Sequence, residues 1–261
     1  MDLGLQGKKA LVGGASRGLG LACARALAAE GCDVALVSRS EENLRDALQT
    51  FKSGRQVIAI AADLSTREGI ETCLSKADAW GPIDILVNNT GGPPAGRSFE
   101  LDDAAWQKAY ESLLLYVRKM CEHFVPDMRR RKWGRIITIT SLTVKEPANH
   151  LVLSNVFRTG LTAYLKVLAR DLAEDGITVN TVLPGAYRTA RYEQLLENTA
   201  KRTGKDKETV AAELVACLPQ KRFQQPEELG ALVAFLASQP ASGITGAAIP
   251  AEGGMLQGLL S

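Results

Sequence analysis

The sequence predicts one α/β domain over residues 1–261, built on a parallel β-sheet. Short apolar runs alternate with longer amphipathic stretches along the chain, and a glycine-rich turn follows the first apolar run. Strands that alternate with helices form right-handed βαβ units. The apolar runs are nearly continuous, as expected of strands covered by helices on both faces. Together these observations predict a single-domain, Rossmann-type doubly wound parallel sheet.

The periodicity gives an expected boundary for each element. We expect strands over residues 9–13, 33–38, 57–61, 83–87, 135–140, 177–183 and 247–250. We expect helices over residues 20–30, 41–51, 67–80, 102–130, 154–174 and 227–237. The polar tract 191–219 interrupts this alternation, and it is either a mobile lid over a pocket or an ordinary helical insert at the surface.

Composition excludes several classes of function. The 31 basic and 29 acidic residues give a net charge of +2, which does not favour a nucleic-acid partner. The basic run 129–132 is interpreted as a solvated helix end. The 5 cysteines are scattered and form no CxxC pair, which predicts reduced thiols, no metal site and a cytoplasmic protein. We expect no signal peptide and no membrane span.

The turn over residues 13–20 has the chemistry of a phosphate-binding loop. Its glycines are Gly14, Gly18 and Gly20, set between the first strand and the first helix. Glycine permits a tight turn, close approach of a diphosphate to the backbone, and close packing of the helix on the strand. The N–H groups at the helix start then face the phosphates. This context predicts a dinucleotide site.

The chain resembles the short-chain dehydrogenase/reductase family over its whole length. The motifs that carry the resemblance are Gly14-Ala-Ser-Arg-Gly-Leu-Gly20, Asn88-Asn-Thr-Gly91, Pro184-Gly185 and Ile244-Thr-Gly246. Its branch resembles the 3-oxoacyl-acyl-carrier-protein reductases. Two motif positions depart from the family: Gly13 stands where threonine is usual, and Thr90 where alanine is usual.

The resemblance implies a nicotinamide dinucleotide cofactor. NADP(H) is favoured over NAD(H), which stays possible, because the second strand ends at Ser38 and Arg39 without an acidic residue. Arg39 and Arg17 can bind a 2′-phosphate through charge-assisted hydrogen bonds. The other expected cofactor contacts are Gly14, Ser16, Gly18, Leu19, Gly20, Asp63, Leu64, Asn89, Gly91, Arg158, Pro184, Gly185, Tyr187 and Thr189.

The family's proton-transfer residues are replaced in this chain. Register places the catalytic serine at Ser141, but Ser154 and Arg158 fall on the tyrosine and lysine positions, and Leu113 on that of the asparagine. A serine hydroxyl is a much poorer acid than a phenol near neutral pH. Ser154 and Arg158 nevertheless share one helical face.

Three other residues are candidates for the proton donor, namely His150, Tyr187 and Lys145, and no single one is selected. The leading hypothesis is hydride transfer between a carbonyl and an alcohol. The alternatives are a catalytically silent dinucleotide-binding sensor or partner subunit, and a different reaction such as dehydration or epimerisation.

The resemblance also implies a homodimer or homotetramer, formed through the long helices after the fourth and fifth strands. Apolar residues available for that contact are Leu113, Leu114, Leu115, Val117, Met120, Leu161, Tyr164, Leu165 and Leu168. Core packing would explain many of the same residues.

Overall fold

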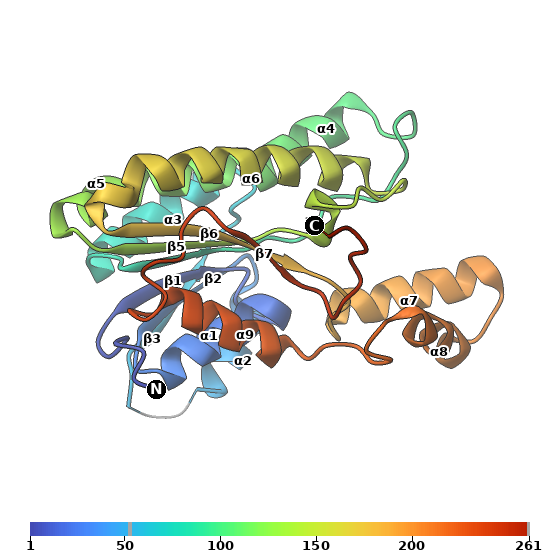
Figure 1. Ribbon diagram of the computed structural model, residues 1–261, viewed down its shortest axis with the longest axis horizontal. Helices are drawn as coiled ribbons and strands as arrows, with labels where there is room; N and C mark the ends of the chain where they lie inside the picture. Colours follow the sequence, from blue (N-terminus) through green and yellow to red (C-terminus); the bar gives the residue numbers. More distant parts are fainter. Residues whose placement is uncertain (52–53, 260–261) are drawn as a thin grey trace.

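Within residues 1–51 and 54–259, which the computed structural model describes, all strands are parallel and form one sheet in the order β3-β2-β1-β4-β5-β6-β7 (Figure 1). The strands are β1 (Lys9–Gly13), β2 (Asp33–Ser38), β3 (Val57–Ala61), β4 (Ile85–Asn88), β5 (Gly134–Ile139), β6 (Ile177–Pro184) and β7 (Ala248–Ala251). The chain reverses its direction of progress between β1 and β4. The expected doubly wound sheet is confirmed, and ligands of such sheets bind beyond the carboxyl ends of the strands at this reversal.

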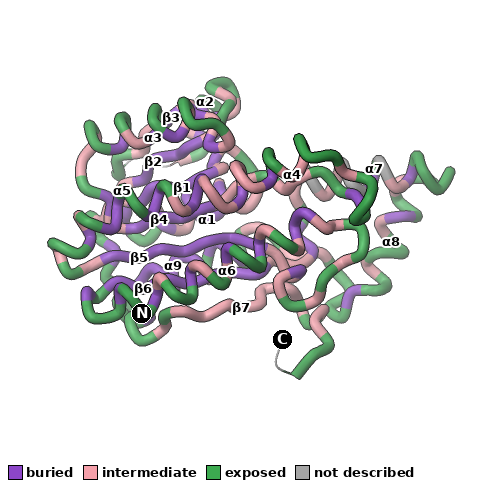
Figure 2. Tube along the Cα trace, turned by 90° about the horizontal axis from the view of Figure 1, so that it is seen from above, coloured by how far each residue is buried: buried purple, intermediate pink, exposed green. Residues whose placement is uncertain are grey.

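Helices cover both faces of the sheet (Figure 1). One face carries α3 (Arg67–Trp80), α4 (Asp103–Ala109), α5 (Tyr116–Arg131) and α6 (Val152–Leu172); the other carries α1 (Gly18–Ala29), α2 (Glu41–Gln49) and α9 (Pro226–Ala237). Alternate strand residues supply the two cores: Leu11 packs toward α3 and α5, while Ala10 and Val12 pack toward α1 and α9. Burial is therefore concentrated along the strands (Figure 2).

The helix expected over residues 102–130 is divided into three parts. α4 passes into a π-helical turn, η1 (Tyr110–Leu115), before α5 begins. Such wide turns are rare and contain one more residue than an α-helical turn. The apolar periodicity continues through the turn, so no feature of the sequence marks it.

Much of the apolar surface expected to form an oligomer contact lies in the core instead. Five of those side chains are at most 2% exposed: Leu113, Val117, Met120, Leu161 and Leu165. Core packing, the alternative explanation, accounts for them. Leu114, Leu115, Tyr164 and Leu168 remain partly exposed.

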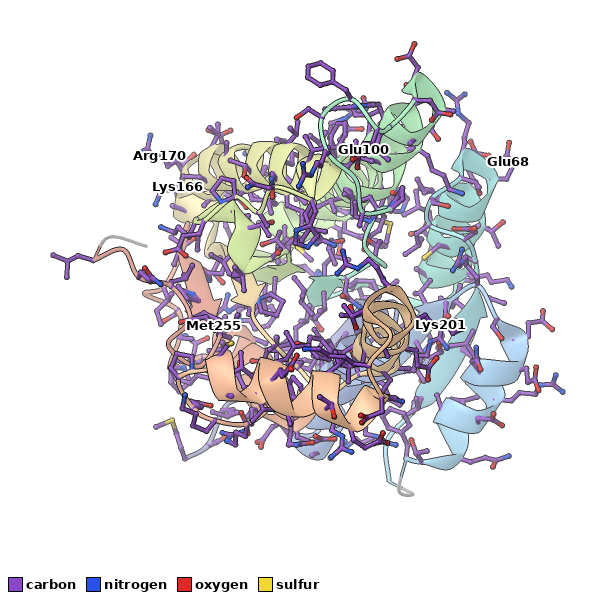
Figure 3. All side chains as sticks on the ribbon, turned by 90° about the vertical axis from the view of Figure 1, so that its right-hand side faces the viewer. Glu68, Glu100, Lys166, Arg170, Lys201 and Met255 are labelled. Carbon is purple, nitrogen blue, oxygen red and sulfur yellow. The ribbon has the colours of Figure 1, made fainter. Side chains whose placement is uncertain are left out.

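The tract 191–219 is helical. It forms α7 (Ala190–Thr203) and α8 (Lys207–Cys217), a hairpin that projects from the body beyond the carboxyl ends of the strands (Figure 1). Its small core contains Leu196, Ala200 and Val210. Figure 3 looks onto the carboxyl edge and shows the helix that carries Lys201 in front of it.

The basic run 129–132 lies at the carboxyl end of α5, as expected, and its side chains are paired. Arg129 and Lys132 contact the Asp175 carboxylate at 2.9 and 2.6 Å. Arg130 contacts Asp127 at 2.7 Å, and Arg131 contacts both Asp127 and Asp84. Among the described helices, none is long and apolar enough to span a membrane.

Candidate functional site

The glycine turn between β1 and α1 requires its glycines. Gly14 and Gly18 both have a backbone φ of 59°, a conformation that residues other than glycine rarely adopt. A Cβ atom at Gly20 would lie 2.3 Å from the carbonyl oxygen of Gly14. The turn is therefore a bare backbone that packs tightly against the helix start.

The amino end of α1 differs from those of the next helices. Ser40, Thr66 and Asp102 cap α2, α3 and α4 with side-chain hydrogen bonds, whereas the N-cap residue of α1, Arg17, makes none. The first N–H groups of a helix need acceptors, and the helix dipole favours an anion there. The residues present therefore fit a diphosphate at this turn.

Neighbouring strands hold the turn in place. The Asn89 side-chain amide, directly after β4, donates to the Gly13 carbonyl at 3.2 Å. The Ala15 N–H donates to the Val37 carbonyl at 3.0 Å. Asn89, which the resemblance assigns to the cofactor, thus also braces the loop that carries the glycines.

Two cations and two hydroxyls lie at the ends of β1 and β2. The Ser16 and Ser38 hydroxyl oxygens are 2.9 Å apart. Arg17 is exposed, and the Arg39 side chain is 75% exposed, with its Nη1 3.9 Å from the Asp63 carboxylate. This group can bind a phosphate beside the dinucleotide turn.

The expected residues after β3 differ in their exposure. Asp63 accepts hydrogen bonds from the N–H and hydroxyl of Ser65 at 3.0 and 2.7 Å, so its carboxylate is held in a fixed orientation. Leu64 is 6% exposed and belongs mainly to the core.

Hydroxyl groups gather at the carboxyl end of β5. The Ser141 Oγ accepts a hydrogen bond from the Thr143 N–H at 3.2 Å and caps the short helix η2 (Leu142–Val144). The Thr143 hydroxyl lies 3.4 Å from the Ser154 hydroxyl. Thr143 thus contacts Ser141 through its main-chain N–H and Ser154 through its hydroxyl. Thr143 links them, and its place two residues after Ser141 was the available sequence signal.

Arg158 makes contacts that the sequence did not predict. Its side chain is buried on α6, and Nη1 donates to the carbonyl oxygens of Ile139 and Thr140 at 3.1 and 3.0 Å. The guanidinium therefore fastens α6 to the end of β5, at the carbonyl of the residue that precedes Ser141.

The segment after β6 returns over the glycine turn. Gly185 donates from its N–H to the Ala251 carbonyl at 3.1 Å, and a Cβ at this position would lie 2.7 Å from Glu252. Thr189 caps α7, and its methyl group lies 3.6 Å from the position that a Gly18 Cβ would occupy. Pro184, Gly185 and Thr189 therefore reach the same edge as the turn.

Comparison with known proteins places this arrangement in a family. A family model described as Enoyl-(Acyl carrier protein) reductase matches residues 14–256. Dehydrogenase/reductase SDR family member 4 of Bos taurus is 31% identical over 258 residues, which cover 98% of this chain and 89% of that protein. The chain belongs to the short-chain dehydrogenase/reductase family.

Solved structures agree with this assignment. L-sorbose reductase from Gluconobacter frateurii, complexed with NADPH and L-sorbose, superposes with a TM-score of 0.94 at 33% identity and covers 99% of this chain and 100% of that one. A variant of actinorhodin polyketide ketoreductase with NADPH superposes with a TM-score of 0.90 at 32% identity and covers 95% and 97% of the two chains.

The three proton-donor candidates of this short-chain dehydrogenase/reductase have different environments. Tyr187 was expected beside the nicotinamide, but it is 3% exposed and packs in the core that α1 and α9 cover. Burial raises its pKa to about 12, so the phenol is a poor donor near neutral pH. His150 and Lys145 are exposed in the loop between β5 and α6, which also carries Thr143.

Proposed function

We propose that this protein is an NADP(H)-dependent oxidoreductase that interconverts a small carbonyl compound and an alcohol. The observation that carries the proposal is the glycine turn with its uncapped helix start, at the reversal point of the sheet. The structural relatives complexed with NADPH support the choice of cofactor. When bound, the dinucleotide donates or accepts hydride at its nicotinamide ring.

We propose that different parts of the cofactor bind at the ends of different strands. Gly14, Gly18, Leu19 and Gly20 would hold the diphosphate through the turn. Ser16, Arg17, Ser38 and Arg39 would hold the 2′-phosphate; Asp63 and Leu64 the adenine; Asn89, Gly91 and Arg158 the riboses. Pro184, Gly185 and Thr189 would close on the nicotinamide side.

The chemistry proposed for this chain's own residues is polarisation of the carbonyl. The hydroxyls of Ser141 and Ser154 can donate hydrogen bonds to a carbonyl oxygen, and Thr143 orients them. The Arg158 cation, held at the carbonyl oxygens of Ile139 and Thr140, would favour the negative charge that develops on that oxygen. His150 or Lys145, in the same loop, or a water molecule would then supply the proton.

Steady-state NADPH oxidation with a panel of aldehydes, ketones and 3-oxoacyl thioesters tests this proposal. We expect turnover with at least one substrate and a large loss of kcat for Ser141→Ala. Thr72→Ala on α3, whose hydroxyl donates to the Glu68 carbonyl within its own helix at 2.8 Å, is the matched control. Cofactor binding without any turnover would contradict the enzymatic proposal.

That outcome would instead support the second candidate, a silent dinucleotide-binding protein. The replacement of the family's tyrosine and lysine by Ser154 and Arg158 favours it.

We also propose a cytoplasmic homodimer or homotetramer. Val156 and Val167 are 47% and 57% exposed and lie on one face of α6. Light scattering of the purified protein tests the assembly, and a monomeric mass would contradict it.

A further inference from the structure

We propose that Tyr116 is a positioning residue for the dinucleotide turn: its phenol occupies the space that a side chain at position 13 would fill and holds Asn89 in place. The inference rests on the proposed function for its link to NADPH binding. Tyr116 is the first residue of α5 and is 2% exposed.

The Tyr116 phenol lies where a side chain at position 13 would extend. A Cβ atom at Gly13 would lie 2.8 Å from the Tyr116 hydroxyl oxygen and 2.8 Å from the carbonyl oxygen of Asn89. Both approaches are closer than ordinary van der Waals contact. Threonine, the usual family residue at this position, therefore could not stand beside Tyr116 without displacing it. Gly13 and Tyr116 form a matched pair.

The same phenol holds the main chain of Asn89. The Tyr116 hydroxyl oxygen and the Asn89 carbonyl oxygen both lie 2.8 Å from the position of a Gly13 Cβ, so the phenol packs against the Asn89 main chain. Burial raises the pKa of Tyr116 far above its usual range and keeps the phenol protonated, although the neighbouring Asn89 N–H acts to lower it. On its other side, the Asn89 side chain donates to the Gly13 carbonyl at 3.2 Å. Asn89 is therefore held at two points, and it in turn holds Gly13, the first residue of the glycine turn.

The π-helical turn sets where Tyr116 points. One extra residue in a turn rotates all later side chains by about 100° around the helix axis. The Thr90 hydroxyl donates to the Ser112 carbonyl within this turn at 3.2 Å. The segment after β4 is thus tied to η1 through Thr90 and to α5 through Asn89, two neighbouring residues.

The first test compares Tyr116→Phe with Tyr164→Phe. Tyr164 is a partly buried tyrosine on α6, and its substitution removes the same hydroxyl group elsewhere. We expect Tyr116→Phe to weaken NADPH binding by about three- to tenfold, the loss of one buried polar contact, with kcat unchanged. Tyr164→Phe should remain within about twofold of the wild type. Equal NADPH affinity in the wild type and Tyr116→Phe would overturn the inference.

A double-mutant cycle with Gly13→Ala tests the shared space. The alanine methyl group should weaken NADPH binding strongly in the wild type and less so in Tyr116→Phe, because one of its two close approaches has gone. We expect non-additivity of at least about threefold. Additive effects would overturn the matched pair. If Gly13→Ala does not fold, the comparison of the two tyrosine variants decides.

If the wild-type protein binds neither NADPH nor NADH, the proposed function is contradicted. The pairing of Gly13 with Tyr116 can still be tested through protein stability. The same cycle would then be measured as urea-unfolding midpoints. Coupling between positions 13 and 116 would support the packing pair, and independent effects would contradict it.

Discussion

Replacement of Arg39 by alanine should convert a preference for NADPH into near indifference between the two dinucleotides. Arg39 follows β2, and its side chain is 75% exposed, 3.9 Å from the Asp63 carboxylate. An exposed ion pair of this kind contributes at most about 1 kcal/mol to stability. The substitution should therefore leave the fold intact.

The expected loss of affinity follows from the bonds that a guanidinium makes to a phosphate. Hydrogen bonds to charged groups contribute about 1.5–3 kcal/mol, which corresponds to about a 10- to 150-fold increase in the Kd for NADPH. NADH has a hydroxyl group in place of the 2′-phosphate. Its Kd should change by less than about threefold, because NADH makes no direct bond to Arg39 and the long-range field of one exposed cation is largely screened by salt.

Titration calorimetry at about 0.15 M salt, near physiological ionic strength, measures both constants. Arg25→Ala is the matched control, since Arg25 is an exposed arginine on α1 whose side chain donates to the Thr50 hydroxyl at 3.2 Å. Arg25→Ala should change neither Kd. Equal losses for NADPH and NADH in Arg39→Ala, or no loss for either, would refute the assignment of Arg39 to the 2′-phosphate.

Three further predictions follow from the site and the core. Gly20→Ala should abolish NADPH binding by calorimetry, because its Cβ would lie 2.3 Å from the Gly14 carbonyl; retained affinity would contradict the tight turn. Ser154→Tyr with Arg158→Lys should raise NADPH oxidation with ketones at least about tenfold, as a phenol is the better acid, and an unchanged rate would show that the acid is not limiting. The pKa of Asp175 is lowered by the Lys132 hydrogen bond and by nearby cations, so Asp175→Asn should lower the urea midpoint at pH 7. That difference should shrink as pH falls below about 4 toward the folded pKa, and a pH-independent difference would contradict the linkage.

The alternation of apolar and amphipathic segments was sufficient to predict the sheet and its helices. Strands β2 and β3 match the expected ranges, because each contains an uninterrupted run of at least four apolar residues. β4 begins two residues later than expected, at Ile85, since Asp84 accepts the Lys9 N–H through its side chain at 2.9 Å. An isolated sequence does not show that a carboxylate takes the place of a ladder bond.

The candidate site was predictable where one residue type has one role. The glycines fit this case, because backbone conformation and close approach both exclude other residues. Arg158 and Tyr187 each have more than one possible role. The cation of Arg158 can bind a ligand or main-chain carbonyls, and the phenol of Tyr187 can face a cavity or pack in the core. Only tertiary packing chooses between these roles, as it also determines the π-helical turn that positions Tyr116.

A crystal structure of the NADPH complex tests the central claim most directly. The account predicts the diphosphate against the backbone of the Gly14–Gly20 turn, at the start of α1, with the 2′-phosphate beside Arg17 and Arg39. Cofactor bound elsewhere on the chain, or a turn left without diphosphate at saturating NADPH, would contradict it.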